Sequence, residues 1–186
     1  MADLTRRELI EILAVIPNPV ETCQWMGRFA GVDFAGLDLS FLNLSQLDLS
    51  HAKFTGCRLK GANFSQSLAT SADFSNADLA EACLEDAVMN QASFVGAQLR
   101  GLRASGVVCE ETDFSDADLT GAWLNGAAFV AARFCRAKLI NVRMHGAILH
   151  LCDWQSATVE GGEWSDLKPW GGQVSKLPFD LPGGAG

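Results

Sequence analysis

An apolar residue recurs at every fifth position through most of this chain. No position in the series from Phe34 to Trp164 carries a charge. Two residues before each of these positions lies a second series, mostly alanine, which includes Ala52, Ala72 and Ala92. Neither an α-helix, with a period of 3.6, nor a flat strand, with a period of 2, explains this spacing. The period instead predicts a coil that turns a corner every five residues, with one large and one small side chain of each side pointing inward.

The number of sides follows from residues that lie 20 apart, because four sides of five residues make one coil. One series of central residues is aromatic throughout: Phe34, Phe54, Phe74, Phe94, Phe114, Phe134 and Trp154. The next is aliphatic throughout: Leu39, Leu59, Leu79, Leu99, Leu119, Leu139 and Val159. A coil of three or five sides would mix these two kinds of residue. We therefore expect a four-sided coil, with about seven coils and a length on the order of 30–35 Å at strand spacing.

The segments ADFSN ADLAE, ANFSQ and TDFSD ADLTG AWLNG match a signature of the form A(D/N)Lxx. In this signature the chain resembles the pentapeptide-repeat family over residues 29–166. The resemblance implies an all-β solenoid, a right-handed four-sided β-helix, and a family whose members are largely non-enzymatic.

A solenoid exposes unpaired backbone and core at both ends and therefore needs caps. Residues 1–28 are predicted to form a short N-terminal capping helix, over residues 3–15, with the segment that joins it to the first coil. Thr5 and Glu8 have the spacing of a capping box, and Leu9, Ile10 and Leu13 offer an apolar face. Binding of a partner by this helix is the alternative to capping.

The repeat stops after Trp164, and residues 167–186 are predicted to form a C-terminal cap and tail. We expect Trp170 to lie over the last coil, Phe179 to be a second anchor, and residues 182–186 to be mobile.

Outward-facing residues can be sorted by side once this register is fixed. Beside the aromatic series, acid and base alternate for much of the column Asp33, Lys53, Asp73, Ser93, Asp113, Arg133, Asp153. The column on the next side behaves similarly: Asp38, Arg58, Asp78, Gln98, Asp118, Lys138, Thr158. Stacked like charges would repel one another, so these columns are typical of a mutually neutralised, solvated surface.

A different outward column is apolar. After Asp48 it reads Leu68, Val88, Val108, Ala128 and Ile148, with Val130 and Leu151 beside it. At strand spacing these five residues make a stripe about 20 Å long. Such a stripe usually marks a contact surface, so we expect these residues to bind a protein partner or a second copy of the chain. Cover by the chain's own tail or N-terminal helix is the alternative.

No catalytic, metal-binding or cofactor-binding constellation stands out. His145 and His150 fall in outward positions without a carboxylate or cysteine set to complete a metal site. The chain has no GxSxG motif and no phosphate-cradling glycine loop. Its six cysteines are widely spaced, as expected for reduced, buried thiols. We therefore expect no enzyme activity, no cofactor and no small-molecule substrate.

The net charge of −8 argues against direct nucleic-acid binding by phosphate neutralisation. The N-terminal sequence does not have the pattern of a signal peptide, and no apolar run is long enough to span a bilayer, so a cytoplasmic protein is expected.

Two functions remain. The first is a non-enzymatic interaction or scaffold module that presents its rod surface to a protein partner. The alternative, which the family resemblance implies, is a DNA mimic that binds a type II topoisomerase such as DNA gyrase and modulates or protects it. Basic residues such as Lys53, Arg58 and Arg133 interrupt the acidic columns and favour the first function.

Overall fold

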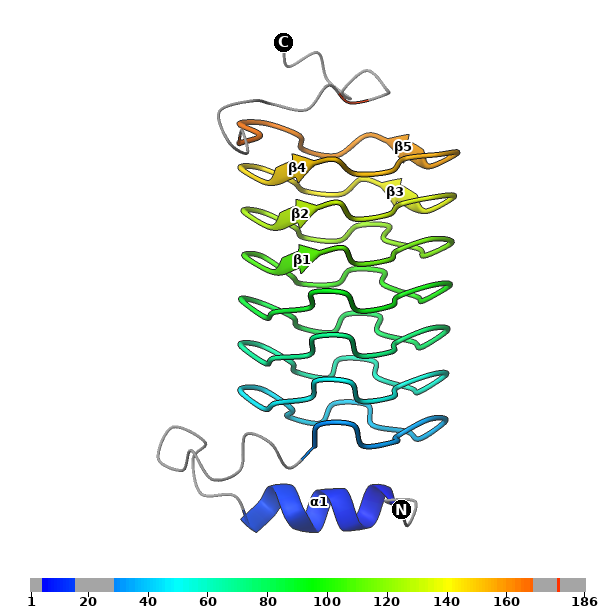
Figure 1. Cartoon of the computed structure of the whole chain (residues 1–186), viewed down its shortest axis with the longest axis vertical. Coiled ribbons are helices and arrows are strands. Elements are labelled where there is room, and N and C mark those ends of the chain that lie inside the picture. The colour runs from blue at the N-terminus through cyan, green and yellow to red at the C-terminus, as the bar shows by residue number, and fades with distance from the viewer. Residues whose placement is uncertain (1–4, 16–28, 169–176, 178–186) are drawn as a thin grey trace.

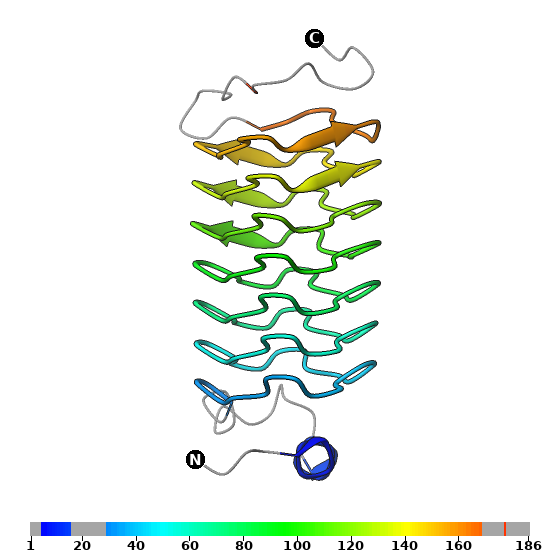
Figure 2. The same ribbon diagram turned by 90° about the vertical axis from the view of Figure 1, so that its right-hand side faces the viewer.

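The computed structural model describes residues 5–15, 29–168 and 177. Four-sided coils are stacked into a rod, and one helix lies beneath the first coil (Figures 1 and 2). The helix is α1 (Arg6–Val15). Five short strands follow: β1 (Val108–Glu110), β2 (Ala128–Val130), β3 (Lys138–Ile140), β4 (Ile148–His150) and β5 (Thr158–Glu160). The expected all-β solenoid with a small N-terminal helix is confirmed.

Residues 20 apart are parallel neighbours along the whole rod. Strands β1, β2 and β4 form one parallel sheet, and β3 and β5 form a second. Val108 pairs with Ala128, and Ala128 pairs with Ile148, while single bridges join the earlier coils in the same register. Backbone hydrogen bonds link each coil to both neighbours, so every interior coil is held from above and below. The prediction of four sides is therefore confirmed.

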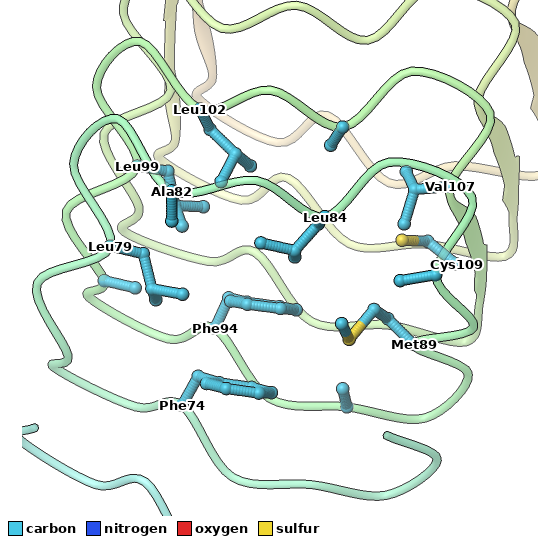
Figure 3. Close-up of a cluster of buried hydrophobic side chains, with 14 of the residues drawn as sticks. Phe74, Leu79, Ala82, Leu84, Met89, Phe94, Leu99, Leu102, Val107 and Cys109 are labelled. Atoms are coloured by element: carbon cyan, nitrogen blue, oxygen red, sulfur yellow. The ribbon is translucent and has the colours of Figure 1, made fainter. Parts of the chain in front are cut away.

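The core is a ladder of aromatic rings along the rod axis. Phe74 and Phe94 stack with ring centroids 4.9 Å apart and planes 3° apart, and Phe94 and Phe114 stack at 5.0 Å. Figure 3 shows the first two rings one above the other inside the coils. Phe64 meets Phe74 edge-on from another side at 5.6 Å. The predicted alanine series is also buried. Ring separations close to the strand spacing show that each coil contributes one ring to the stack.

Each corner of the coil contains a residue with positive φ. Most are not glycine: Phe41 has φ 61° and Gln46 has φ 60°. Glycine adopts this conformation without strain, and at some corners its small size also leaves room for a neighbouring side chain. A Cβ on Gly61 would lie 2.7 Å from two ring carbons of Phe41, because that ring covers the corner of the next coil.

The family signature has a local cause in the turns. Wherever Asp or Asn precedes a central residue, its Oδ1 accepts a hydrogen bond of 2.8–3.1 Å from the backbone N–H two residues later. The acceptors are Asp33, Asp38, Asn43, Asp48, Asn63, Asp73, Asp78, Asp113, Asp118 and Asp153. Such side-chain turns compete with extended structure. Accordingly, all five strands begin with a residue other than Asp or Asn.

The N-terminal helix begins with the expected capping box. The backbone N–H of Thr5 donates to Glu8 Oε2 at 2.7 Å, and the N–H of Glu8 donates to Thr5 Oγ1 at 3.3 Å. Leu9 is fully buried in the core, which supports the capping role. The expectation for Ile10 is wrong: this side chain is 41% exposed, because only a narrow stripe of a single helix can contact the first coil. The side chain of Leu13 lies outside the described residues.

At the other end, Trp154 stacks on Phe134 at 4.4 Å, and Trp164 is 3% exposed. Leu177 packs against the core. Trp170, Phe179 and residues 182–186 lie outside the described residues. No helix within the described ranges is long and apolar enough to cross a membrane.

Candidate partner-binding surface

The apolar residues predicted on one side of the rod form one continuous column. Leu68 bridges Val88, and Val88 bridges Val108. The column continues through the paired strands β1, β2 and β4 to Ala128 and Ile148. We call Leu68, Val88, Val108, Ala128 and Ile148 the ridge.

The ridge is less exposed than a set of isolated surface residues would be. Leu68 is 37% exposed, and the other four side chains are half-buried. Each of these side chains is partly covered by its neighbours in the coils above and below, at strand spacing. The ridge is therefore a shallow apolar strip and not a row of projecting side chains.

The two other predicted site residues widen the strip toward its C-terminal end. Val130 is half-buried and points outward from β2, in the same strand as Ala128. Leu151 follows β4 at the corner and is 71% exposed. Together with Ala128 and Ile148, these residues make the C-terminal end of the strip its broadest part.

The ridge also lacks the turn hydrogen bond found on other sides. Asp48, directly before Leu68 in the column, accepts a hydrogen bond of 2.9 Å from the backbone N–H of Ser50. The five ridge residues cannot accept such a bond. A hydrogen bond of this kind contributes about 0.5–1.5 kcal/mol. Five successive apolar residues in this column are therefore not explained by the stability of the turns.

The first two sides of the rod are neutralised by ion pairs between successive coils, as expected. Lys53 Nζ lies 3.7 Å from Asp33 Oδ2, and Arg58 Nη2 lies 3.0 Å from Asp38 Oδ2. Arg133 pairs with Asp113 at 3.6 Å. These contacts make the two sides solvated, mixed-charge surfaces in contrast to the ridge.

An exposed cluster around Trp123 was missed by the sequence analysis. Trp123 is 45% exposed on the side next to the ridge, and its neighbours in the column are Arg103 and Arg143. The guanidinium carbon of Arg143 lies 4.6 Å from the centroid of the Trp123 ring. Trp123, Arg103 and Arg143 share one phase of the repeat. Sorting the outward residues of the side between the aliphatic series and the ridge would therefore have found the cluster.

Reactive groups are dispersed over the rod. His145 Nδ1 lies 2.9 Å from Ser165 Oγ and 3.2 Å from Asp166 Oδ2. Within the described residues, no group of three or more His, Cys, Asp or Glu side chains could hold a metal ion.

The described cysteines have free thiols, whereas Cys23 lies outside the described residues. Burial raises the pKa of Cys57 and of Cys152 to about 11. These two thiols therefore stay protonated at neutral pH, which makes them poor nucleophiles.

Comparison with known proteins begins with the family model described as pentapeptide repeats. It matches in eight copies, over residues 28–66, 72–108, 92–129 and 112–150. A comparison with curated proteins finds no match.

Solved structures with similar folds include a trypsin-treated variant of QnrB1, a plasmid-mediated fluoroquinolone resistance protein. It is 21% identical, with a TM-score of 0.44, and the alignment covers 76% of this chain and 77% of that one. HetL, a pentapeptide-repeat protein involved in heterocyst differentiation regulation in the cyanobacterium Nostoc, is 19% identical. Its TM-score is 0.39, and the alignment covers 87% of this chain and 93% of that one.

Proposed function

This chain belongs to the pentapeptide-repeat family, and we propose that it is a non-enzymatic interaction module whose rod presents the ridge to a protein partner. The observation that carries this proposal is the contrast between the sides. On two sides the outward columns contain acids and bases that form ion pairs, whereas the ridge column is apolar over five successive coils. Contiguous apolar surface of this kind marks contact sites in proteins.

The rod is also well suited to binding without rearrangement. Its coils are held together by backbone hydrogen bonds on every side, and a column of stacked rings runs through its core. Val88, Val108 and Ile148 are β-branched and have few rotamers to lose. Binding to such a surface costs little ordering free energy, so a modest apolar area can give useful affinity.

The absence of catalysis is part of the proposal. Outward acids such as Asp73 and Asp118 are engaged in turn hydrogen bonds, and Arg100 also pairs with Asp118 at 2.7 Å. The buried thiols of Cys57 and Cys152 are protonated at neutral pH. The repeat sets the positions of these acids and thiols, and within the described residues they do not converge into a set of nucleophile, base and oxyanion donor.

The test compares three baits in pull-downs. The first is the unmodified protein, and the second carries Val88→Lys and Val108→Lys in the middle of the ridge. The third is a matched control with Gln98→Lys and Thr158→Lys, which adds the same charge to the opposite side of the coil. Partners should be retained by the first and third baits and lost from the second, because a desolvated charge without a counterion is costly. Equal capture by all three folded baits would contradict the proposal.

The DNA-mimic alternative is supported by the rod shape and the net charge of −8. It is weakened by the ion pairs of Lys53, Arg58 and Arg133, which interrupt the negative columns. We expect no effect of the purified protein on supercoiling by DNA gyrase. Inhibition of the enzyme, or its protection from a quinolone, would favour the alternative.

A further inference from the structure

We propose that the ridge binds the ridge of a second copy of the chain, with the two rods antiparallel. The inference rests on the proposed function, because it names the partner of the same surface. It comes from the two charged residues that bound the ridge and from the symmetry of the residues between them.

An acid and a base flank the five ridge residues in their column. A backbone β-bridge pairs Asp48 with Leu68 at one end, and another pairs Lys168 with Ile148 at the other. Within the described part of the chain, neither of these charged side chains forms an ion pair. This differs from the neighbouring sides, where Lys53 pairs with Asp33 one coil away.

Asp48 and Lys168 cannot pair with each other inside one molecule. They lie six coils apart in the column, which is about 29 Å at strand spacing. The Debye length at physiological ionic strength is about 8 Å, so their attraction within one rod is screened. An oppositely charged group on another molecule can pair with each of them at close range.

An antiparallel second copy supplies that group at both ends. Val108 is the midpoint of the column, three coils from each charged residue. A two-fold axis that crosses the ridge at this point places Val108 against its equivalent. It also places Val88 against Ala128, Leu68 against Ile148, and Asp48 against Lys168. The contact is isologous and closes after two copies. In a parallel pair, Asp48 would face Asp48 and Lys168 would face Lys168. Repulsion between these like charges disfavours the parallel arrangement.

One residue opposes the antiparallel pair and so gives a specific check on it. Glu110 is exposed and points outward beside Val108 in β1. The same axis brings Glu110 close to its equivalent, and two facing carboxylates weaken association. Glu110→Gln should therefore tighten the dimer. If Glu110 lay far from the two-fold axis, the same substitution would leave association unchanged.

The experiment is a charge swap followed by sedimentation equilibrium, from about 10 µM to about 1 mM protein at low salt. Asp48→Lys alone and Lys168→Asp alone should each weaken the dimer at least about tenfold, since each places two like-charged pairs in the contact. The double swap should return the affinity close to that of the unmodified protein. Asp48→Asn is a second variant that keeps an acceptor for the Ser50 N–H but removes the charge, and it should also weaken the dimer.

The outcomes separate this inference from the proposed function. A monomer at all concentrations would overturn the inference, as would a double swap that does not restore association. If the protein is monomeric but Val88→Lys with Val108→Lys still abolishes capture of other proteins, the ridge remains a contact surface and only the second copy is wrong. A dimer that survives the ridge substitutions would overturn the inference, and unchanged capture of other proteins by the same variant would contradict the proposed function.

Discussion

Replacing Phe94 by alanine tests the aromatic ladder that supports the rod. Phe94 is 1% exposed and stacks between Phe74 at 4.9 Å and Phe114 at 5.0 Å. A buried Phe→Ala change costs about 3–5 kcal/mol through lost transfer free energy and a cavity. Two stacked contacts, each contributing about 0.5–1.5 kcal/mol beyond area burial, place the expected loss near the upper end of that range. The rings above and below are fixed by their own coils, so the cavity cannot collapse.

The measurement is urea-induced unfolding followed by circular dichroism, with Phe41→Ala as the matched control. Phe41 is 74% exposed and only covers the corner at Gly61, so its loss should change the free energy of unfolding by about 0.5 kcal/mol or less. Equal effects of the two substitutions would refute the ladder as the source of stability. A reduced denaturant slope in the Phe94 variant would instead show that the rod unfolds in two parts.

Two further predictions concern register and acidity. Ala92 is 1% exposed, and inserting one residue after it should unfold the later coils because inward and outward positions are exchanged. Inserting a whole five-residue repeat at the same place should cost less stability. Circular dichroism and denaturant midpoints distinguish the two variants. Burial alone would raise the pKa of Asp118, but hydrogen bonds from Thr120 and Arg100 hold it below its ordinary value of 3.8. Its contribution to stability is therefore complete above that pH and lost as the pH falls below it, so the denaturant midpoint should fall less steeply in acid for Asp118→Asn than for the unmodified protein.

Much of the rod could be predicted from the sequence because the period ties each residue to its neighbour 20 positions away. That relation placed Phe74 under Phe94 and Val88 under Val108 without any knowledge of local conformation. It also placed acid next to base, as at Asp33 and Lys53. In a solenoid, tertiary contacts are set by the repeat itself, so a correct period gives a correct contact map.

Other features depend on contacts that the period does not describe. The exposure of Ile10 follows from how a single helix lies on the first coil. The half-burial of the ridge depends on how far each side chain is covered by its neighbours. Every three-residue strand begins at a residue without the Asp or Asn turn bond, but many other sides that lack this bond form only single bridges. Trp123 was overlooked although its column could have been sorted.

Side-chain oxidation by hydroxyl radicals tests most directly whether the ridge is the contact surface. The isolated protein at low concentration is compared with the complexes retained in the pull-down, or with the dimer at high concentration. Oxidation of Leu68, Ile148 and Leu151 should fall on association, whereas Phe41, at 74% exposure, should be oxidised to the same extent in both samples. Unchanged oxidation of the ridge residues in an associated sample would contradict the account.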